Sequence, residues 1–152
     1  MLMLEKDFLW KKNVIFVITF LFIVVILGIT SYNKLKTEKN SVLKFNQEFE
    51  EYNKQDLNGL DVITLINKAT SNNEKYNIKK NDDNIYILDD EYSIEIYVIF
   101  DDVSYSMERI NNSGTNSFIK LFADVKFDCK EVTYHKKNGR IASLVFESKD
   151  YK

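Results

Sequence analysis

The chain of 152 residues has no proline, four glycines, one cysteine and one histidine. The single cysteine forms no internal disulfide, and Cys129 with His135 supplies fewer ligands than a zinc site needs. The sequence contains no Walker loop, no G-x-G-x-x-G and no G-x-S-x-G motif. These absences predict a protein that is not an enzyme and that holds no cofactor or metal.

Clustered positive charge is also scarce. Arginine occurs twice against 19 lysines, and the part from Ser31 onward carries 18 Lys+Arg against 21 Asp+Glu, a net charge of −3. A nucleic-acid surface is basic and clustered, and bidentate recognition of phosphate depends on arginine. The sequence therefore predicts no nucleic-acid partner.

What is present is a long uncharged apolar run, Val14 to Thr30, of 17 residues. A helix of this length reaches roughly 26 Å, close to the core thickness of a bilayer. Trp10 and Tyr32 lie near its two ends, as interfacial aromatic residues do. The run predicts a transmembrane helix at 14–30, between a cytoplasmic tail at 1–13 and an extracytoplasmic domain at 31–152.

Two other interpretations of the run stay open. A buried core helix is disfavoured because the 122 residues that follow are few to enclose it. A cleaved signal peptide is disfavoured because the apolar stretch is longer than usual and Gly28-Ile29-Thr30 matches A-x-A poorly. The lysines on the two sides nearly balance, but a short tail before a first apolar segment favours a signal-anchor with the domain outside the cell membrane.

The segment after the run has helical periodicity. One stripe recurs at spacings of seven, three, four and three residues, and consists of Leu35, Val42, Phe45, Phe49 and Tyr52. The stripe predicts a helix that continues from Val14 to about Asn53 and packs on the protein's own sheet, with a coiled-coil seam as the alternative. Leu57-Asn58-Gly59 predicts a turn, and Asp61 is the expected N-cap of a second helix ending at 70–73.

Period-two patterns, typical of strands, follow. They predict strands at 85–88, 92–100, 103–107, 126–135 and 140–147, while 117–124 fits a short helix or a strand equally well. Residues 111–116 are expected to form a loop. The fold class is therefore α+β: a transmembrane helix extended into an amphipathic helix, a second short helix, and an antiparallel sheet of about five strands.

Asn138-Gly139 is the strongest hairpin signal, because both residues of a two-residue turn of this type take positive φ. The predicted register places Lys137 opposite Arg140 and His135 opposite Ala142. His135 is then an exposed polar residue beside the turn. Cys129 alternates with Phe127, which predicts a buried thiol on the core face, with a nucleophile as the alternative.

Acidic residues gather at the predicted turns: Asp82-Asp83, Asp89-Asp90-Glu91 and Asp101-Asp102. Strand ends explain them as turn residues. Calcium binding is the alternative, although no D-x-D-x-D-G loop is present. These turns support the rival functional hypothesis, an extracytoplasmic domain that senses a small ligand or calcium.

The main hypothesis is a membrane-anchored extracytoplasmic module that binds a protein partner or associates with itself. Nine tyrosines occur in the chain, and tyrosine gives a large contact area at low entropic cost. Tyr86 and Tyr97 are candidate exposed contact residues on strand faces. The alternative is that these side chains only cover the sheet.

Two stretches carry a resemblance: residues 45–52, Phe-Asn-Gln-Glu-Phe-Glu-Glu-Tyr, and residues 58–66, Asn-Gly-Leu-Asp-Val-Ile-Thr-Leu-Ile. With Asn72-Asn73, they resemble single-span pilin-like and pilus-assembly proteins of clostridia-like bacteria. The layout of an apolar helix, an amphipathic extension and a sheet is similar to type IV pilins. The pilin leader glycine and the early glutamate of the mature helix have no counterpart here. The resemblance implies a place in a cell-envelope or pilus-like assembly.

Overall fold

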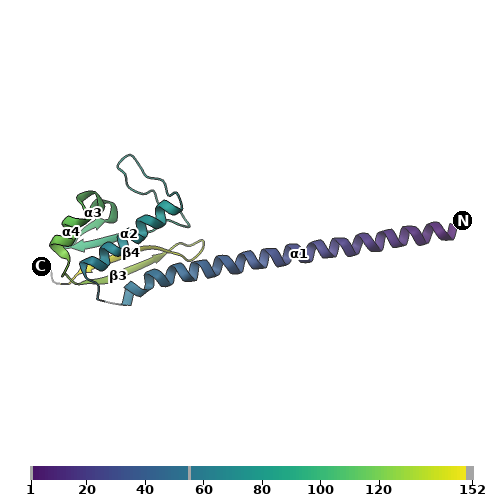
Figure 1. Ribbon diagram of the computed structural model, residues 1–152, viewed down its shortest axis with the longest axis horizontal. Coiled ribbons are helices and arrows are strands. Elements are labelled where there is room, and N and C mark those ends of the chain that lie inside the picture. The colour runs from purple at the N-terminus through teal and green to yellow at the C-terminus, as the bar shows by residue number, and fades with distance from the viewer. Residues whose placement is uncertain (1, 55, 150–152) are drawn as a thin grey trace. The chain divides into compact units, whose positions relative to one another are not determined.

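The computed structural model describes residues 2–54 and 56–149, with side chains at 13–53 and 56–149 (Figure 1). The chain forms two compact units, Met1–Ser41 and Val42–Lys152. The class is α+β, as predicted.

The first unit is helical and belongs to α1 (Leu2–Glu50). Its large apolar side chains from Ile15 to Ile29 are between 49% and 71% exposed. This is the one helix among the described residues that is long and apolar enough to cross a membrane, and none of its apolar window is buried. A buried core helix is therefore the wrong interpretation of the run, whereas a signal sequence at this place meets the same criteria.

The second unit is built on a four-stranded sheet in the order β2-β1-β4-β3. The strands are β1 (Glu95–Phe100), β2 (Val103–Ser106), β3 (Phe127–Tyr134) and β4 (Ile141–Ser148). β1 pairs antiparallel with β2 and β3 antiparallel with β4, but β1 and β4 are parallel. The prediction of an all-antiparallel sheet of about five strands is corrected in both respects.

Both corrections have a structural cause. Residues 107–122 form α3 (Met107–Ser113) and α4 (Thr115–Phe122), which carry the chain from one edge of the sheet to the other. β4 then returns beside β1 in the same direction. The segment 85–88 adds no strand, because Tyr86 only forms an isolated bridge with Lys80.

The hydrophobic core lies between one face of the sheet and the helices. Ile94, Ile96 and Val98 alternate along the chain into β1 and are fully buried, as the period-two pattern predicts. α2 (Gly59–Lys75) packs on them with its own buried side chains. Phe49, near the end of α1, is 2% exposed and joins this core, so the predicted stripe packs on the sheet at that end.

The start of α2 differs from the prediction by three residues. Asn58, not Asp61, is the N-cap, and its side chain accepts from the backbone N–H groups of Leu60 and Asp61. Asp61 accepts the Asn58 N–H in return and completes a capping box. A 3-10 turn, η1 (Glu51–Lys54), precedes this cap.

The β3–β4 hairpin is confirmed, but its register is not the predicted one. His135 donates its backbone N–H to Arg140 and accepts from Gly139, so His135 faces Arg140 rather than Ala142. Only Gly139 takes positive φ in this loop, at +73°. The two-residue turn that the sequence predicts needs positive φ at both of its central residues, so this loop is not that turn. Asn138 donates its side-chain amide to the backbone carbonyl of Glu91.

Candidate functional site

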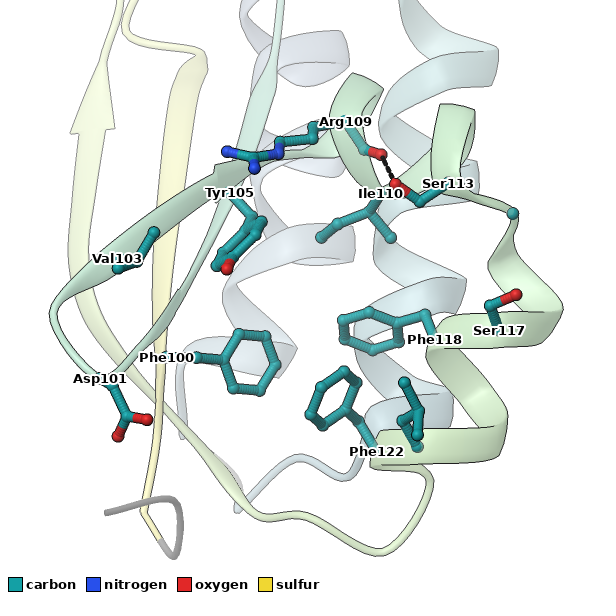
Figure 2. A pocket seen from close by; sticks show the side chains of 12 residues that line it. Phe100, Asp101, Val103, Tyr105, Arg109, Ile110, Ser113, Ser117, Phe118 and Phe122 are labelled. Atoms are coloured by element: carbon teal, nitrogen blue, oxygen red, sulfur yellow. Dashed lines mark hydrogen bonds between the residues drawn. The ribbon is translucent and has the colours of Figure 1, made fainter.

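A cleft of about 420 Å³ opens between the β1–β2 hairpin and the helices α3 and α4 (Figure 2). Rings from β1, β2 and α4 form its wall: Phe100, Tyr105, Phe118 and Phe122. The centres of the Phe100 and Phe122 rings are 4.4 Å apart. This is the volume and apolar lining that small-ligand sites and anchor pockets have.

The position of each ring follows from the local sequence. Phe100 ends β1 on the same face as Val98, and Tyr105 pairs opposite Val98, so both rings project to the helical side of the sheet. Phe118 and Phe122 are four residues apart and share one face of α4. Gly114, with φ of +90°, makes the sharp corner between α3 and α4.

The rim of the cleft is apolar and open to solvent. Leu121 is 67% exposed and Val103 is 47% exposed. Arg109 lies at one end, with its guanidinium 4.6 Å from the centre of the Tyr105 ring. Figure 2 shows Arg109 and Asp101 at opposite ends of the cleft. Arg109 forms no ion pair with the acidic side chains that the structure describes.

The two predicted contact residues lie elsewhere. Tyr86 is 5% exposed, so its prediction as an exposed contact residue is corrected: its ring packs into the core beneath the Lys80 ammonium, 4.4 Å away. Tyr97 is partly buried and donates its hydroxyl to the Glu95 carboxylate. Burial and this carboxylate raise the pKa of Tyr97.

His135 is 8% exposed, so the expectation of an exposed side chain is wrong. Its Nε2 lies 2.7 Å from the carbonyl oxygen of Ser93 and ties the hairpin to the segment before β1. Cys129 packs against the core, on the predicted face, but it is only partly buried rather than buried, and burial raises the pKa of its thiol. A raised pKa lowers the thiolate fraction, which does not favour a nucleophile.

The acidic turns use their side chains on the backbone. The Asp89 carboxylate accepts from the N–H groups of Glu91, Tyr92 and Ser93. Burial opposes ionisation of Asp89, but these hydrogen bonds outweigh it and lower its pKa. Asp101 and Asp102 take positive φ and make the β1–β2 turn, as predicted. In the described part of the chain, no three His, Cys, Asp or Glu side chains are grouped to hold a metal ion.

Two buried carboxylates were not found by sequence reasoning. Glu108, at the start of α3, is 4% exposed, and neither carboxylate oxygen has a hydrogen-bond partner among the described residues. Glu95 is 7% exposed, and burial, together with the Glu108 charge, raises its pKa. Glu95 lies between the buried Ile94 and Ile96, a position that period-two alternation marks as polar, and periodicity carries no signal for what covers that face.

The sequence does not predict the cleft. It shows only apolar residues within 118–122, in a pattern that fits a helix or a strand. No protein-family model, no curated protein and no solved structure matches the chain. The features that bear on function are therefore the geometry of the cleft and the apolar run of α1.

Proposed function

We propose that the protein is a single-pass membrane protein whose second unit works outside the cytoplasm by binding protein partners. We assign it to a cell-envelope or pilus-like assembly, with the N-terminal tail inside. In this function the protein binds its partners and catalyses no reaction.

The exposed run of α1 supports the membrane anchor. Thirteen large apolar side chains from Ile15 to Ile29 face outward around the helix, and water is a poor solvent for such a surface. The two hydroxyl groups in the run are satisfied internally: Thr19 donates to the Ile15 carbonyl and Thr30 to the Leu27 carbonyl. A helix with no unpaired polar group is the form that a lone span takes in lipid.

The observation that carries the binding function is the open cleft with its exposed apolar rim. Leu121 and Val103 expose apolar surface next to a ring-lined hollow, and anchor side chains of partner proteins fill hollows of this kind. Apolar surface that is exposed beside a concave site marks an interaction surface.

Photocrosslinking from the rim tests this function. Full-length protein in its native membranes carries benzoylphenylalanine in place of Leu121, and the matched control carries it at Asn116, an exposed position of α4 that does not line the cleft. We expect a discrete protein adduct at 121 that is weak or absent at 116. Equal adducts at both positions, or none at 121, contradict the proposal.

The size of the cleft favours one second candidate, a small apolar ligand. A volume of about 420 Å³ falls within the range of small-ligand sites. In that case native mass spectrometry of the full-length protein finds a bound small molecule, and Leu121→Glu releases it. The same sample then gives no protein adduct in membranes.

A further inference from the structure

A second exposed apolar surface lies on the segment between α2 and β1. Ile85, Ile87 and Leu88 are 39%, 53% and 53% exposed. Three large apolar side chains within four residues of a surface segment are unusual when nothing covers them. Asp90, which follows them, is also exposed.

The backbone of this segment is held in place. Ile87 donates its N–H to the Lys79 carbonyl, and Asn81 donates its N–H to the Ile85 carbonyl. Tyr86, between Ile85 and Ile87, is buried and fixes the side to which its neighbours point. Ile85 and Ile87 are therefore presented outward by a defined backbone conformation, and the exposed fraction of Leu88 shows that its side chain is also open to solvent.

The segment and the cleft are complementary. The cleft is a ring-lined hollow that opens to solvent, while Ile87 and Leu88 are apolar and project into solvent. Arg109 gives the cleft a cation at its rim, and Asp90 gives the segment an exposed anion. No residue of 85–90 lines the cleft of its own chain.

We propose that Ile87 and Leu88 of one copy seat in the cleft of a second copy, with Asp90 facing Arg109 across the contact. This inference rests on the proposed function and names the partner of that site. The two surfaces differ, so the contact is head-to-tail. Repetition of such a contact builds a ring or an open row of copies, whereas a self-complementary contact stops at a dimer.

Two full-length variants separate the two surfaces. Leu121→Glu blocks the cleft and Leu88→Glu blocks the segment, and both leucines are more than half exposed, so the fold tolerates the change. Leu60→Glu is the matched control, since Leu60 is 50% exposed on α2 and lies outside both surfaces. Sedimentation velocity in mild detergent measures the size of the oligomers.

We expect concentration-dependent oligomers larger than a dimer for the wild type and for Leu60→Glu. Each blocked variant alone is monomeric. An equimolar mixture of the two forms dimers and nothing larger, because one intact cleft meets one intact segment. A monomeric wild type, a mixture that stays monomeric, or a mixture that reaches the wild-type size overturns the head-to-tail contact.

Charge reversal tests the polar part of the contact. Arg109→Asp and Asp90→Arg each weaken association by about tenfold, and a chain that carries both recovers it. Failure of the double variant to recover overturns the pairing of these two residues. The crosslink from position 121 separates this inference from the proposed function: an adduct to residues 85–90 of another copy supports both, an adduct to a different protein overturns only the inference, and no adduct overturns both.

Discussion

The guanidinium carbon of Arg140 lies 3.7 Å from the centre of the Phe45 ring. The contact joins the end of α1 to the β3–β4 hairpin, which is distant in the sequence. The same guanidinium lies 5.0 Å from the Tyr76 ring and 5.3 Å from the Tyr92 ring, and Nη2 donates to Asn72. Arg140 is 2% exposed, and among the side chains that the structure describes, ring faces and an amide rather than an acidic group accommodate this buried cation.

Arg140→Lys is expected to lower the free energy of unfolding by about 1–3 kcal/mol, because an ammonium group cannot stack on several rings as a planar guanidinium does. Unfolding of the full-length protein in nanodiscs by guanidinium chloride measures the change in this free energy. Arg109→Lys is the control, since Arg109 is exposed and stacks on one ring. Equal losses in the two variants contradict the structural role assigned to Arg140.

Asn73 is fully buried and extends the hydrogen bonding of the sheet. Its amide donates to the Ile94 carbonyl and its carbonyl accepts the Ile94 N–H, both at 2.9 Å. Asn73→Ala leaves both backbone groups buried and unpaired, and we expect a loss of about 2–4 kcal/mol. Asn67→Ala, at an exposed position of the same helix, is expected to change stability by less than about 0.5 kcal/mol. Denaturant unfolding measures the loss in the free energy of unfolding for both variants. Similar losses in the two argue against this role of Asn73.

Gly59 lies where the backbones of α2 and α4 approach each other closely. A Cβ atom there falls 2.1 Å from the Phe122 carbonyl oxygen, which is backbone and cannot rotate away. Gly59→Ala is therefore expected to destabilise by about 1–3 kcal/mol and to disturb the cleft that Phe122 lines. Gly28→Ala is the control, because nothing lies within 4 Å of its added methyl group. An unchanged melting temperature for Gly59→Ala is the result that speaks against this packing.

Glu95 links stability to pH. Burial and the nearby Glu108 charge raise its pKa above the ordinary 4.5, so the folded state binds this proton more tightly than the unfolded state does. Stability is therefore highest below pH 4.5 for this group and falls as pH rises through the raised pKa. Glu95→Gln removes that fall and raises stability at pH 7 by about 1 kcal/mol, because a neutral amide at this buried position costs less to desolvate than a carboxylate.

The measurement is the melting temperature of full-length protein against pH. Glu131→Gln, at an exposed position on β3, which β4 separates from β1, serves as the control and is expected to leave the profile unchanged. A wild-type profile that rises between pH 4.5 and pH 7, together with a Glu95→Gln profile of the same shape, contradicts the expected direction of the pH dependence.

The elements that periodicity marks strongly were predictable, and the choices that depend on tertiary contacts were not. The alternation of Ile94, Ile96 and Val98 identified β1 and its buried face. Nothing local shows that β4 pairs with β1, because the crossover depends on α3 and α4, which have seven and eight residues. Helices this short span about two turns and leave little periodic signal.

The candidate site also depends on tertiary contacts that the local sequence does not reveal. Phe118 and Phe122 were identified as part of an apolar pattern, but the cleft exists only because Phe100 and Tyr105 arrive from the hairpin. Tyr86 was misplaced because an isolated short apolar run does not reveal which side chain turns inward. The Asn58 cap was missed because Asp61 is also a good cap residue, and only the backbone geometry distinguishes the two.

The anchoring of the domain outside the membrane is the central claim, and cysteine accessibility in intact cells tests it most directly. In a Cys129→Ser background, one full-length variant carries Asn116→Cys and another Lys6→Cys. We predict that a membrane-impermeant maleimide labels position 116 in intact cells and position 6 only after permeabilisation, with both proteins resistant to carbonate extraction. Labelling of position 6 but not 116 in intact cells, or release of full-length protein by carbonate, contradicts the account.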